Sequence, residues 1–254
     1  MMNVSIIGTG NVAKHLFDAL LKCENIAVHQ VIGRSKEQLF YFEKETTVTY
    51  KWNKIQEVDV YIIAVSDDSI SLVSEHLKDD NGLVVHTAGS VSLDTLSLKN
   101  RRGVFYPLQT FREGQKVNFK TVPICIETEK EADLKILSQL ANALSDVVHE
   151  ITSDQRKYLH LAAVFINNFT NHIYQIGDEI CTAQELPFSI LQPLLMETAE
   201  KMKAFSPYEA QTGPAKRNDI GTIEKHMDLL KTDAHKRIYA LLSQSIQQTY
   251  GKKL

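Results

Sequence analysis

Cysteine is scarce in this sequence, and long apolar runs are missing. The 254 residues include three cysteines, Cys23, Cys125 and Cys181, with no C-x-x-C pair and no histidine at metal-ligand spacing. We therefore expect reduced, small apolar side chains rather than disulfides or a metal site. No run approaches the length of a membrane helix, and the N-terminus enters a β-branched run without a signal peptide. These features predict a cytoplasmic protein.

Neither sign of charge dominates the sequence. Lysine and arginine number 28 against 31 aspartates and glutamates, which gives a net charge of −3 and a pI near 6.3. This balance lacks the electrostatic footprint of a DNA- or RNA-binding protein, so we expect no nucleic acid as a partner. The apolar share of 43% is ordinary for a globular protein, and the length suffices for two modest domains.

Glycines are concentrated where the first strand is expected to end. Residues 4–7 are a short β-branched run, Gly8-x-Gly10-x-x-Ala13 follows, and apolar residues then recur at helical spacing. The pattern predicts a strand, a tight turn and a helix. It is typical of dinucleotide binding, and the alternative is a βα turn that is purely structural.

Each small residue of this turn has a physical role. Gly8 can adopt the positive φ of an abrupt turn, and Gly10 lets a pyrophosphate approach the backbone N–H groups at the helix N-terminus. Ala13 keeps the helix close to the strand. We therefore expect the turn to bind the cofactor through Gly8, Thr9, Gly10, Asn11 and Val12.

The end of the second predicted strand, residues 26–32, indicates which nicotinamide cofactor fits. NAD-binding sites usually place a carboxylate here for the ribose hydroxyls. This chain instead has Arg34 and Ser35, and a guanidinium binds phosphate through two parallel hydrogen bonds. The sequence therefore favours NADP over NAD. The alternative is that Arg34 is simply solvated, with Glu37 as its partner.

Strand and helix patterns alternate along the next part of the chain. Residues 58–65 form a near-continuous apolar run, a helix is expected at 70–77, and another strand at 83–87. The alternation predicts a parallel sheet, whose carboxyl edge binds ligands. Residues expected to line the cofactor there are Val65, Ser66, His86, Thr87, Ala88 and Gly89. Strands at 104–106, 122–127 and 147–150 and a helix at 131–144 complete the predicted sheet.

The β pattern ends near residue 151. Helices are predicted at residues 154–181, 187–203, 220–230 and 234–250. We therefore predict an α/β fold, a Rossmann-type doubly wound parallel sheet followed by an all-α domain. The expected domains are residues 1–150, which bind NADP, and residues 151–254, which form a helical domain for substrate binding and dimerisation.

A polar line runs along the first of these helices. At 100° per residue, His160, Asn167, Asn171 and Asp178 fall within about 20° of one direction. Apolar residues surround the first half of the helix, which predicts that this half is buried. His160 suits proton transfer near neutral pH, and Asn167 can orient a carbonyl or amide, so both are candidate catalytic residues. The alternative is that both bond to backbone or to a neighbouring subunit.

A second unusual segment spans residues 212–219. Gly213 and Pro214 break the helix, and Asp219 is placed to cap the helix that follows. Those roles leave Thr212 and Arg217 unexplained. We expect Thr212, Arg217 and Asp219 to bind an anionic substrate or to line a dimer interface.

Taken together, these motifs resemble NADP-dependent reductases with an N-terminal Rossmann domain and a helical C-terminal domain like that of 6-phosphogluconate dehydrogenase. The group includes pyrroline-5-carboxylate reductase, the β-hydroxyacid dehydrogenases and the deazaflavin-dependent NADP reductases. The chain is most similar to a bacterial branch of NADP oxidoreductases. The matching segments are residues 8–13, 65–67, 86–90 and 106–111, His160 with Asn167, and residues 212–214 with Arg217 and Asp219.

The resemblance implies hydride transfer between NADPH and a small carbonyl, imine or hydroxy acid in a cleft between domains. It also implies a homodimer built through the helical domains. The chain departs from the β-hydroxyacid dehydrogenases, which carry Lys and, one turn later, Asn, whereas here His160 is followed by Val164 at that spacing. The alternative from another class is a non-catalytic NADP-binding sensor or interaction protein.

Overall fold

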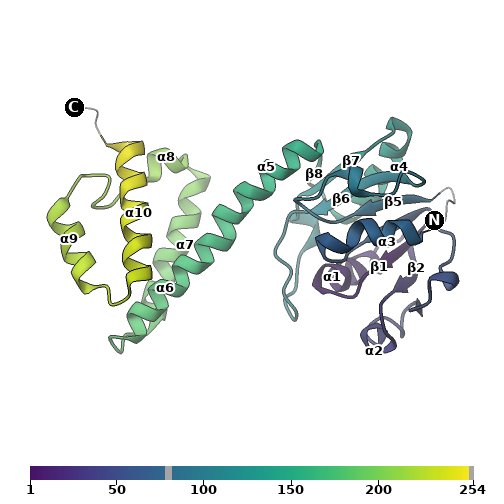
Figure 1. Cartoon of the computed structure of the whole chain (residues 1–254), viewed down its shortest axis with the longest axis horizontal. Helices are drawn as coiled ribbons and strands as arrows, with labels where there is room; N and C mark the ends of the chain where they lie inside the picture. The colour runs from purple at the N-terminus through teal and green to yellow at the C-terminus, as the bar shows by residue number, and fades with distance from the viewer. Residues whose placement is uncertain (78–81, 252–254) are drawn as a thin grey trace. The chain divides into compact units, whose positions relative to one another are not determined.

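The computed structural model describes residues 1–77 and 82–251 (Figure 1). The chain divides into two compact units, Met1–Phe165 and Ile166–Leu254, and each is described by itself below. The domain boundary expected near residue 151 follows the last strand of the sheet, and it stays a prediction.

The first unit is built on one eight-stranded sheet with the order β3-β2-β1-β4-β5-β6-β7-β8. The strands are β1 (Met2–Ile7), β2 (Ile26–Ile32), β3 (Thr47–Thr49), β4 (Val60–Ile63), β5 (Leu83–His86), β6 (Arg101–Pro107), β7 (Ile124–Thr128) and β8 (Val148–Glu150). Six of the neighbouring pairs run parallel, and β6 and β7 run antiparallel.

The antiparallel pair departs from the all-parallel sheet that alternation predicts. A parallel neighbour needs a crossover connection, usually a helix. Within residues 108–123, all of which the structure describes, the helical structure is limited to the 3₁₀ turn Phe119–Thr121. Without a crossover helix, the chain returns beside β6 in the opposite direction.

Helices cover both faces of the sheet, as a doubly wound fold requires (Figure 1). The helices of this unit are α1 (Asn11–Leu20), α2 (Lys36–Leu39), α3 (Ile70–His76) and α4 (Glu131–Leu144). Ile62 packs in the cluster that contains residues of α1 and α4, whereas the next residue, Ile63, packs in the cluster that contains residues of α3. Because both side chains are fully buried, β4 has the continuous apolar sequence of an interior strand. The predicted Rossmann-type fold is confirmed.

The predicted long helix continues through a π-helical segment. It comprises α5 (Ser153–Ala163), the π segment Val164–Phe169 and α6 (Thr170–Thr182). A π-helix has i→i+5 hydrogen bonds and wider turns than an α-helix. An angle of 100° per residue therefore does not hold between His160 and Asn171, so the single polar line predicted along this helix is not retained.

The rest of the chain is helical, as predicted. It contains α7 (Gln192–Glu200), flanked by 3₁₀ turns at Phe188–Leu191 and Lys201–Lys203, and then α8 (Pro207–Ala210), α9 (Ile220–Leu229) and α10 (Asp233–Tyr250). Three short elements, β3, α2 and α8, are absent from the sequence prediction because three or four residues carry no readable periodicity.

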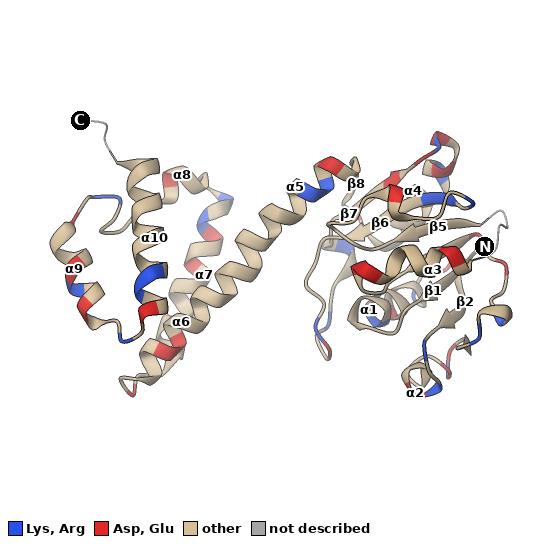
Figure 2. Cartoon of the chain, viewed as in Figure 1, with Lys and Arg blue, Asp and Glu red and all other residues tan. Residues whose placement is uncertain are grey.

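The first half of the long helix is not buried, contrary to the sequence prediction. Leu161 and Phe165 expose 52% and 60% of their surface. The spacing of apolar residues shows which face of a helix is apolar. That face is buried only where another part of the protein covers it. Residues 158–177 contain no Asp, Glu, Lys or Arg, and Figure 2 shows this run of the helix in tan between its charged ends.

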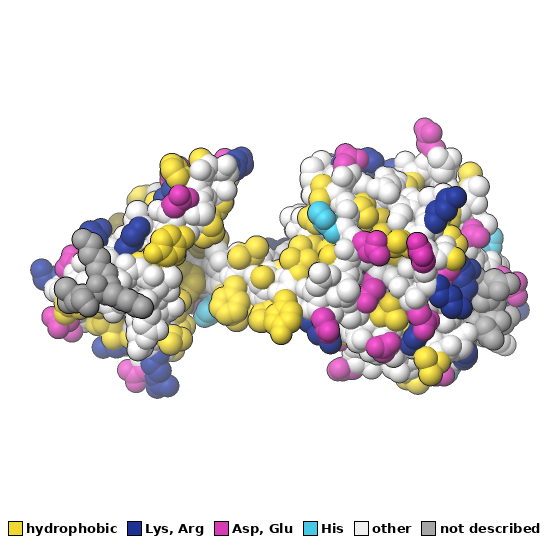
Figure 3. Space-filling view, turned by 90° about the horizontal axis from the view of Figure 1, so that it is seen from above, with side chains coloured by type: hydrophobic (Ala, Val, Ile, Leu, Met, Phe, Trp, Pro, Cys, Tyr) yellow, Lys and Arg dark blue, Asp and Glu magenta, His cyan; other side chains and the backbone are white. Residues whose placement is uncertain are grey.

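The second unit has almost no buried core of its own. Among its described residues, Ala215 is the one that is buried. Figure 3 shows apolar side chains gathered along α5 and α6. Large apolar side chains with high exposure include Ile166 (77%), Ile190 (63%), Met196 (64%), Leu229 (71%) and Leu241 (67%). Over the described residues, no helix has both the length and the apolar character needed to cross a bilayer.

Candidate active site

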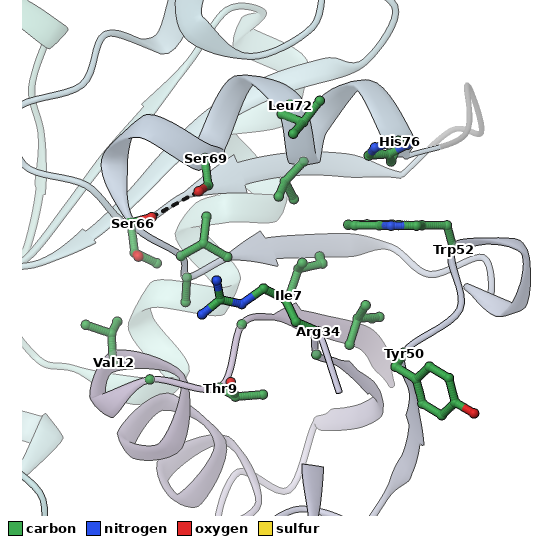
Figure 4. A pocket seen from close by; sticks show the side chains of 18 of the residues that line it. Ile7, Thr9, Val12, Arg34, Tyr50, Trp52, Ser66, Ser69, Leu72 and His76 are labelled. Atoms are coloured by element: carbon green, nitrogen blue, oxygen red, sulfur yellow. Dashed lines mark hydrogen bonds between the residues drawn. The ribbon is translucent and has the colours of Figure 1, made fainter. Parts of the chain in front are cut away.

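A pocket of about 580 Å³ lies at the carboxyl ends of the first, second and fourth strands (Figure 4). It brings together most of the residues expected to bind a cofactor. Those that line it are Gly8, Thr9, Gly10, Asn11, Val12, Arg34, Val65, Ser66 and Thr87. The lining does not include Ser35, His86, Ala88 or Gly89, and their predicted contacts with the cofactor stay predictions.

The turn between β1 and α1 forms one wall of the pocket. Gly8 has φ +132°, and a Cβ there would lie 2.0 Å from the carbonyl oxygen of Ala64, so glycine is required. A Cβ on Gly10 would meet no atom within 4 Å. Gly10 is also the N-cap of α1, and because glycine has no side chain, it leaves the first N–H groups of the helix uncapped. The first N–H groups of the helix are therefore available to an anion in the pocket.

The side chain of Asn11 ties this wall to the loop after β6. Its amide donates to the carbonyl oxygen of Phe111 at 3.2 Å, and Lys14 pairs with Glu113 at 2.8 Å. The loop after β6 is thereby held against the start of α1. The turn is positioned by these bonds as well as by its glycines.

Arg34 extends from the end of β2 into the pocket (Figure 4). Within the described part of the chain its guanidinium makes no ion pair or hydrogen bond. Glu37, the partner considered for it, is instead hydrogen-bonded to Ser35, which lowers the pKa of that carboxyl below its usual value. A guanidinium with no carboxylate partner is suited to bind an added anion.

Aromatic side chains close the far end of the pocket, and sequence reasoning missed them. Trp52 stacks on His76 with ring centroids 4.6 Å apart, and Tyr50 lies beside them (Figure 4). Tyr50 and Trp52 follow β3, which pairs with β2 at the sheet edge. The available signal was that Trp52 is the one tryptophan in the chain.

The carboxyl ends of β4 and β5 supply polar groups. The Ser66 and Ser69 hydroxyls are hydrogen-bonded at 3.0 Å, a contact drawn as a dashed line in Figure 4, and Thr87 lines the pocket. Just before it, His86 accepts a hydrogen bond at Nδ1 from the backbone N–H of Ala88. Burial lowers the pKa of His86 to about 4, so its ring is neutral at physiological pH.

His160 lies against the loop that follows β5. Its Nδ1 is 3.2 Å from the hydroxyl of Tyr106, at the end of β6. A Cβ on Gly89 would come within 2.6 Å of the same nitrogen. The structure thus places His160 against Gly89, which the sequence assigned to the site, and against Tyr106, which belongs to a segment that carries the family resemblance.

Arg156, one turn before His160 on α5, fixes the helix to this loop. It is fully buried, pairs with Glu127 of β7 and donates to the carbonyl oxygen of Val91. Glu127 also accepts bonds from the backbone and hydroxyl of Ser153, the first residue of α5. Sequence reasoning missed this network, because its members lie far apart in the chain.

Other predicted residues lie in the second unit. Asn167 belongs to the π segment, and its catalytic role stays a prediction. Asp219 caps α9 by accepting bonds from the backbone and hydroxyl of Thr222, as expected. Asn218 has φ +56°, a conformation that asparagine tolerates better than most residues. Thr212 and Arg217 belong to the same loop, and their role in binding a substrate or lining an interface likewise stays a prediction.

No group of histidines, cysteines and carboxylates in the described ranges could hold a metal ion. The glycine turn and the Arg34 guanidinium line one pocket, and this arrangement suits an organic anion.

Comparison with known proteins identifies the family of the chain. Residues 3–88 match the family described as NADP oxidoreductase, coenzyme F420-dependent, and residues 122–246 match a domain of unknown function, DUF2520. A putative NADP oxidoreductase from Bacteroides fragilis is 36% identical, with a TM-score of 0.86 over 97% of this chain and 98% of that one. No curated protein matches the sequence.

Two more distant structures share the fold. A pyrroline-5-carboxylate reductase from Coxiella burnetii is 18% identical, with a TM-score of 0.57 over 98% of this chain and 97% of that one. A reductive aminase from Aspergillus terreus is 10% identical, with a TM-score of 0.73 over 99% and 95%.

The sheet order and the pocket at its carboxyl edge are those of a nicotinamide-dependent oxidoreductase fold. The chain belongs to the family of NADP oxidoreductases that join an N-terminal coenzyme F420-dependent NADP oxidoreductase domain to a DUF2520 domain.

Proposed function

We propose that this protein is a cytoplasmic enzyme that uses NADP(H) and transfers a hydride between its nicotinamide and a small carbonyl, imine or hydroxy acid. The observation that carries the proposal is Arg34, whose guanidinium has no ion pair or hydrogen bond in the described ranges and which lines the same pocket as the glycine turn. The 2′-phosphate of NADP is the anion that would pair with this cation, whereas NAD has a neutral hydroxyl at the same position.

The residues present fit such a cofactor. The open space beside Gly10 admits a pyrophosphate, the N-terminus of α1 favours its charge, and Arg34 would hold the 2′-phosphate. Trp52 and Tyr50 offer aromatic surface for a base. When bound, the reduced nicotinamide supplies the hydride.

Reduction of a carbonyl or imine also needs a proton. We assign it to His160, whose ring lies against Gly89, two residues after the pocket residue Thr87. Asn167 would orient the substrate, and Thr212, Arg217 and Asp219 would bind an anionic substrate or line an interface. The site would lie in a cleft between the predicted domains.

Named relatives support this reaction class. The Aspergillus terreus enzyme is a reductive aminase whose structure contains NADPH and ethyl levulinate, and the Coxiella burnetii protein is a pyrroline-5-carboxylate reductase. A ketone and an imine are the acceptors these names imply. The same acceptor groups are the first to screen for this chain.

We further propose that the protein is a homodimer assembled through its helical part. A folded unit needs buried apolar area, at roughly 25 cal/mol per Å², to offset its loss of chain entropy. The second unit leaves side chains such as Ile166 and Leu241 exposed and has one buried residue among those described. A second copy presents an identical surface, so a two-fold contact would cover both.

The first test is titration of the purified full chain with NADPH and with NADH, followed by fluorescence. We expect NADPH to bind more tightly, and Arg34→Ala to weaken NADPH binding about 10- to 100-fold, since a charge-assisted phosphate bond contributes roughly 1.5–3 kcal/mol. NADH binding should change little. Lys36→Ala, which alters a nearby cation outside the pocket lining, is the matched control.

Failure to bind either nucleotide would overturn the proposal and favour a Rossmann-shaped interaction protein. Tight NADPH binding without turnover of any ketone, imine or 3-hydroxy acid would favour the sensor alternative.

A further inference from the structure

One edge of the His160 ring faces into the protein. Its Nδ1 lies 3.2 Å from the Tyr106 hydroxyl, and the two rings meet edge to face with centroids 6.2 Å apart. Within the described ranges, Nε2 makes no hydrogen bond. The two nitrogens of an imidazole lie on different edges of the ring, so Nε2 can form a hydrogen bond with a ligand while Nδ1 bonds to Tyr106.

Gly89 makes room for this arrangement. A Cβ at this position would lie 2.6 Å from Nδ1 of His160 and 2.8 Å from Cζ of Tyr106, distances that real Cβ atoms essentially never show. Gly89 is not one of the glycines with positive φ. Its backbone could therefore carry a side chain, and the reason for glycine here is space for the two rings.

The tyrosine is suited to act as the donor in the pair. Burial is the main cause that raises the pKa of Tyr106 to about 12, with Cys125 and Asp67 adding to the increase and Arg156 opposing it. The phenol therefore keeps its proton at every pH at which the protein would work. It can donate to a neutral Nδ1 without losing that proton.

We propose that Tyr106 donates a hydrogen bond to Nδ1 of His160 and thereby holds the neutral imidazole as the Nε2–H tautomer. Tyr106 is a positioning residue: it sets which ring nitrogen carries the proton and which way the ring faces. The proposal deepens the function proposed above, since Nε2–H is the group that His160 would present to a carbonyl or imine substrate.

Contacts around the pair hold the His160 and Tyr106 rings next to each other. His160 is one turn after Arg156 on α5, and Arg156 binds Glu127 and the Val91 carbonyl. His86 holds the start of the same loop through the N–H of Ala88. The loop that carries Gly89 is thus fixed at both ends, and the ring contact is part of the folded scaffold.

The test is long-range ¹H–¹⁵N correlation NMR of the full chain labelled with ¹⁵N at histidine, recorded without nucleotide. His160→Asn identifies the His160 signals by their loss. At a pH where His160 is neutral, we expect the pattern of a protonated Nε2 and an unprotonated Nδ1. Tyr106→Phe should shift both nitrogens toward the averaged values of exchanging tautomers.

Gly89→Ala provides a second, independent variant. Its methyl group would separate the rings, so it should move the His160 signals in the same direction as Tyr106→Phe. Two matched controls should leave them unchanged. Tyr239→Phe removes the hydroxyl 2.8 Å from Nδ1 of another histidine, His226, and Gly221→Ala adds a Cβ that meets nothing within 4 Å.

A native His160 in the Nδ1–H form, or a His160 pattern that ignores both Tyr106→Phe and Gly89→Ala, would overturn the proposal. This readout needs neither nucleotide nor turnover, so its failure is distinct from failure of the NADPH titration. Once an acceptor is known, Tyr106→Phe should lower kcat by about 10-fold, less than the roughly 100-fold or more expected from loss of the acid itself.

Discussion

The ring of Trp52 lies over the ring of His76, with centroids 4.6 Å apart and planes inclined by 22°. One residue comes from the 3₁₀ turn after β3 and the other from the last turn of α3, so the stack joins two sides of the pocket. Because Trp52 is the one tryptophan of the chain, its emission reports on this pocket alone.

The first prediction uses this reporter. We expect NADPH to quench Trp52 emission in a saturable way, because a base in the pocket would contact the indole or displace His76. His76→Ala should change the emission of the free protein and leave a saturable response to NADPH. A Trp52 signal that stays constant while NADPH binds by calorimetry would show that the cofactor lies elsewhere.

The second prediction distinguishes the structural role of Gly8 from the cofactor-binding role of Gly10. Gly8→Ala places a Cβ 2.0 Å from the Ala64 carbonyl at a positive φ, so it should destabilise the fold by about 3 kcal/mol or more. Gly10→Ala meets no atom within 4 Å, so it should unfold in urea at nearly the native midpoint. It should nevertheless weaken NADPH binding about 10-fold or more, equivalent to about 1.4 kcal/mol.

Normal stability of Gly8→Ala would contradict the close approach of the turn to β4. Normal NADPH affinity of Gly10→Ala would contradict the placement of the pyrophosphate against this helix.

The third prediction concerns pH and His86. The pKa of His86 is about 4 in the folded protein, compared with 6.5 for a histidine in the unfolded chain. Between pH 6.5 and pH 4, the unfolded chain therefore binds a proton that the folded chain does not. Stability should therefore fall as pH drops from about 6.5 to about 4, by at most roughly 3 kcal/mol from this residue. Urea unfolding at several pH values measures it.

His86→Asn should lose this part of the pH dependence, although it lowers stability at pH 7 by removing buried contacts. The stability gap between native protein and variant should thus narrow toward pH 4. His29→Asn, at an exposed position of β2, is the control and should keep the native slope. A gap that is constant across this range would contradict a neutral, buried His86.

The fourth prediction concerns assembly. Ile166→Glu puts a charge on a side chain that is 77% exposed within one chain, and if a second copy covers it, the dimer should dissociate. Sedimentation velocity should then show a monomer for this variant and a dimer for the native chain. Leu98→Glu changes an apolar side chain of the first unit that is 84% exposed, and it should remain dimeric. A monomeric native protein would contradict the prediction.

Local patterns were sufficient to predict most of the sheet. The turn at Gly8 and Gly10 has its own short-range signature, and the apolar run of β4 has the length and composition of an interior strand. The direction of β7 could not be predicted in the same way, because it depends on a connection that lacks a helix. Tertiary pairing alone creates β3, which has three residues.

For the same reason, only some of the residues that line the pocket could be predicted from the sequence. Residues of the glycine turn and Arg34 belong to a sequence motif, whereas Trp52 and His76 meet only when β3 and α3 take their places. Likewise, His160 could be singled out on a helix, but its neighbours Tyr106 and Gly89 lie more than 50 residues away in the chain. The π segment carries no periodicity of its own that would reveal it.

The uncharged run of the long helix, residues 158–177, also bears on how temperature and salt would act on assembly. A contact made through Ile166 and its apolar neighbours contains no charges for salt to screen, so ionic strength should affect it little. The hydrophobic contribution weakens on cooling. A dimer built on this surface would therefore be cold-labile: chilled, dilute protein would separate into subunits that reassociate on warming.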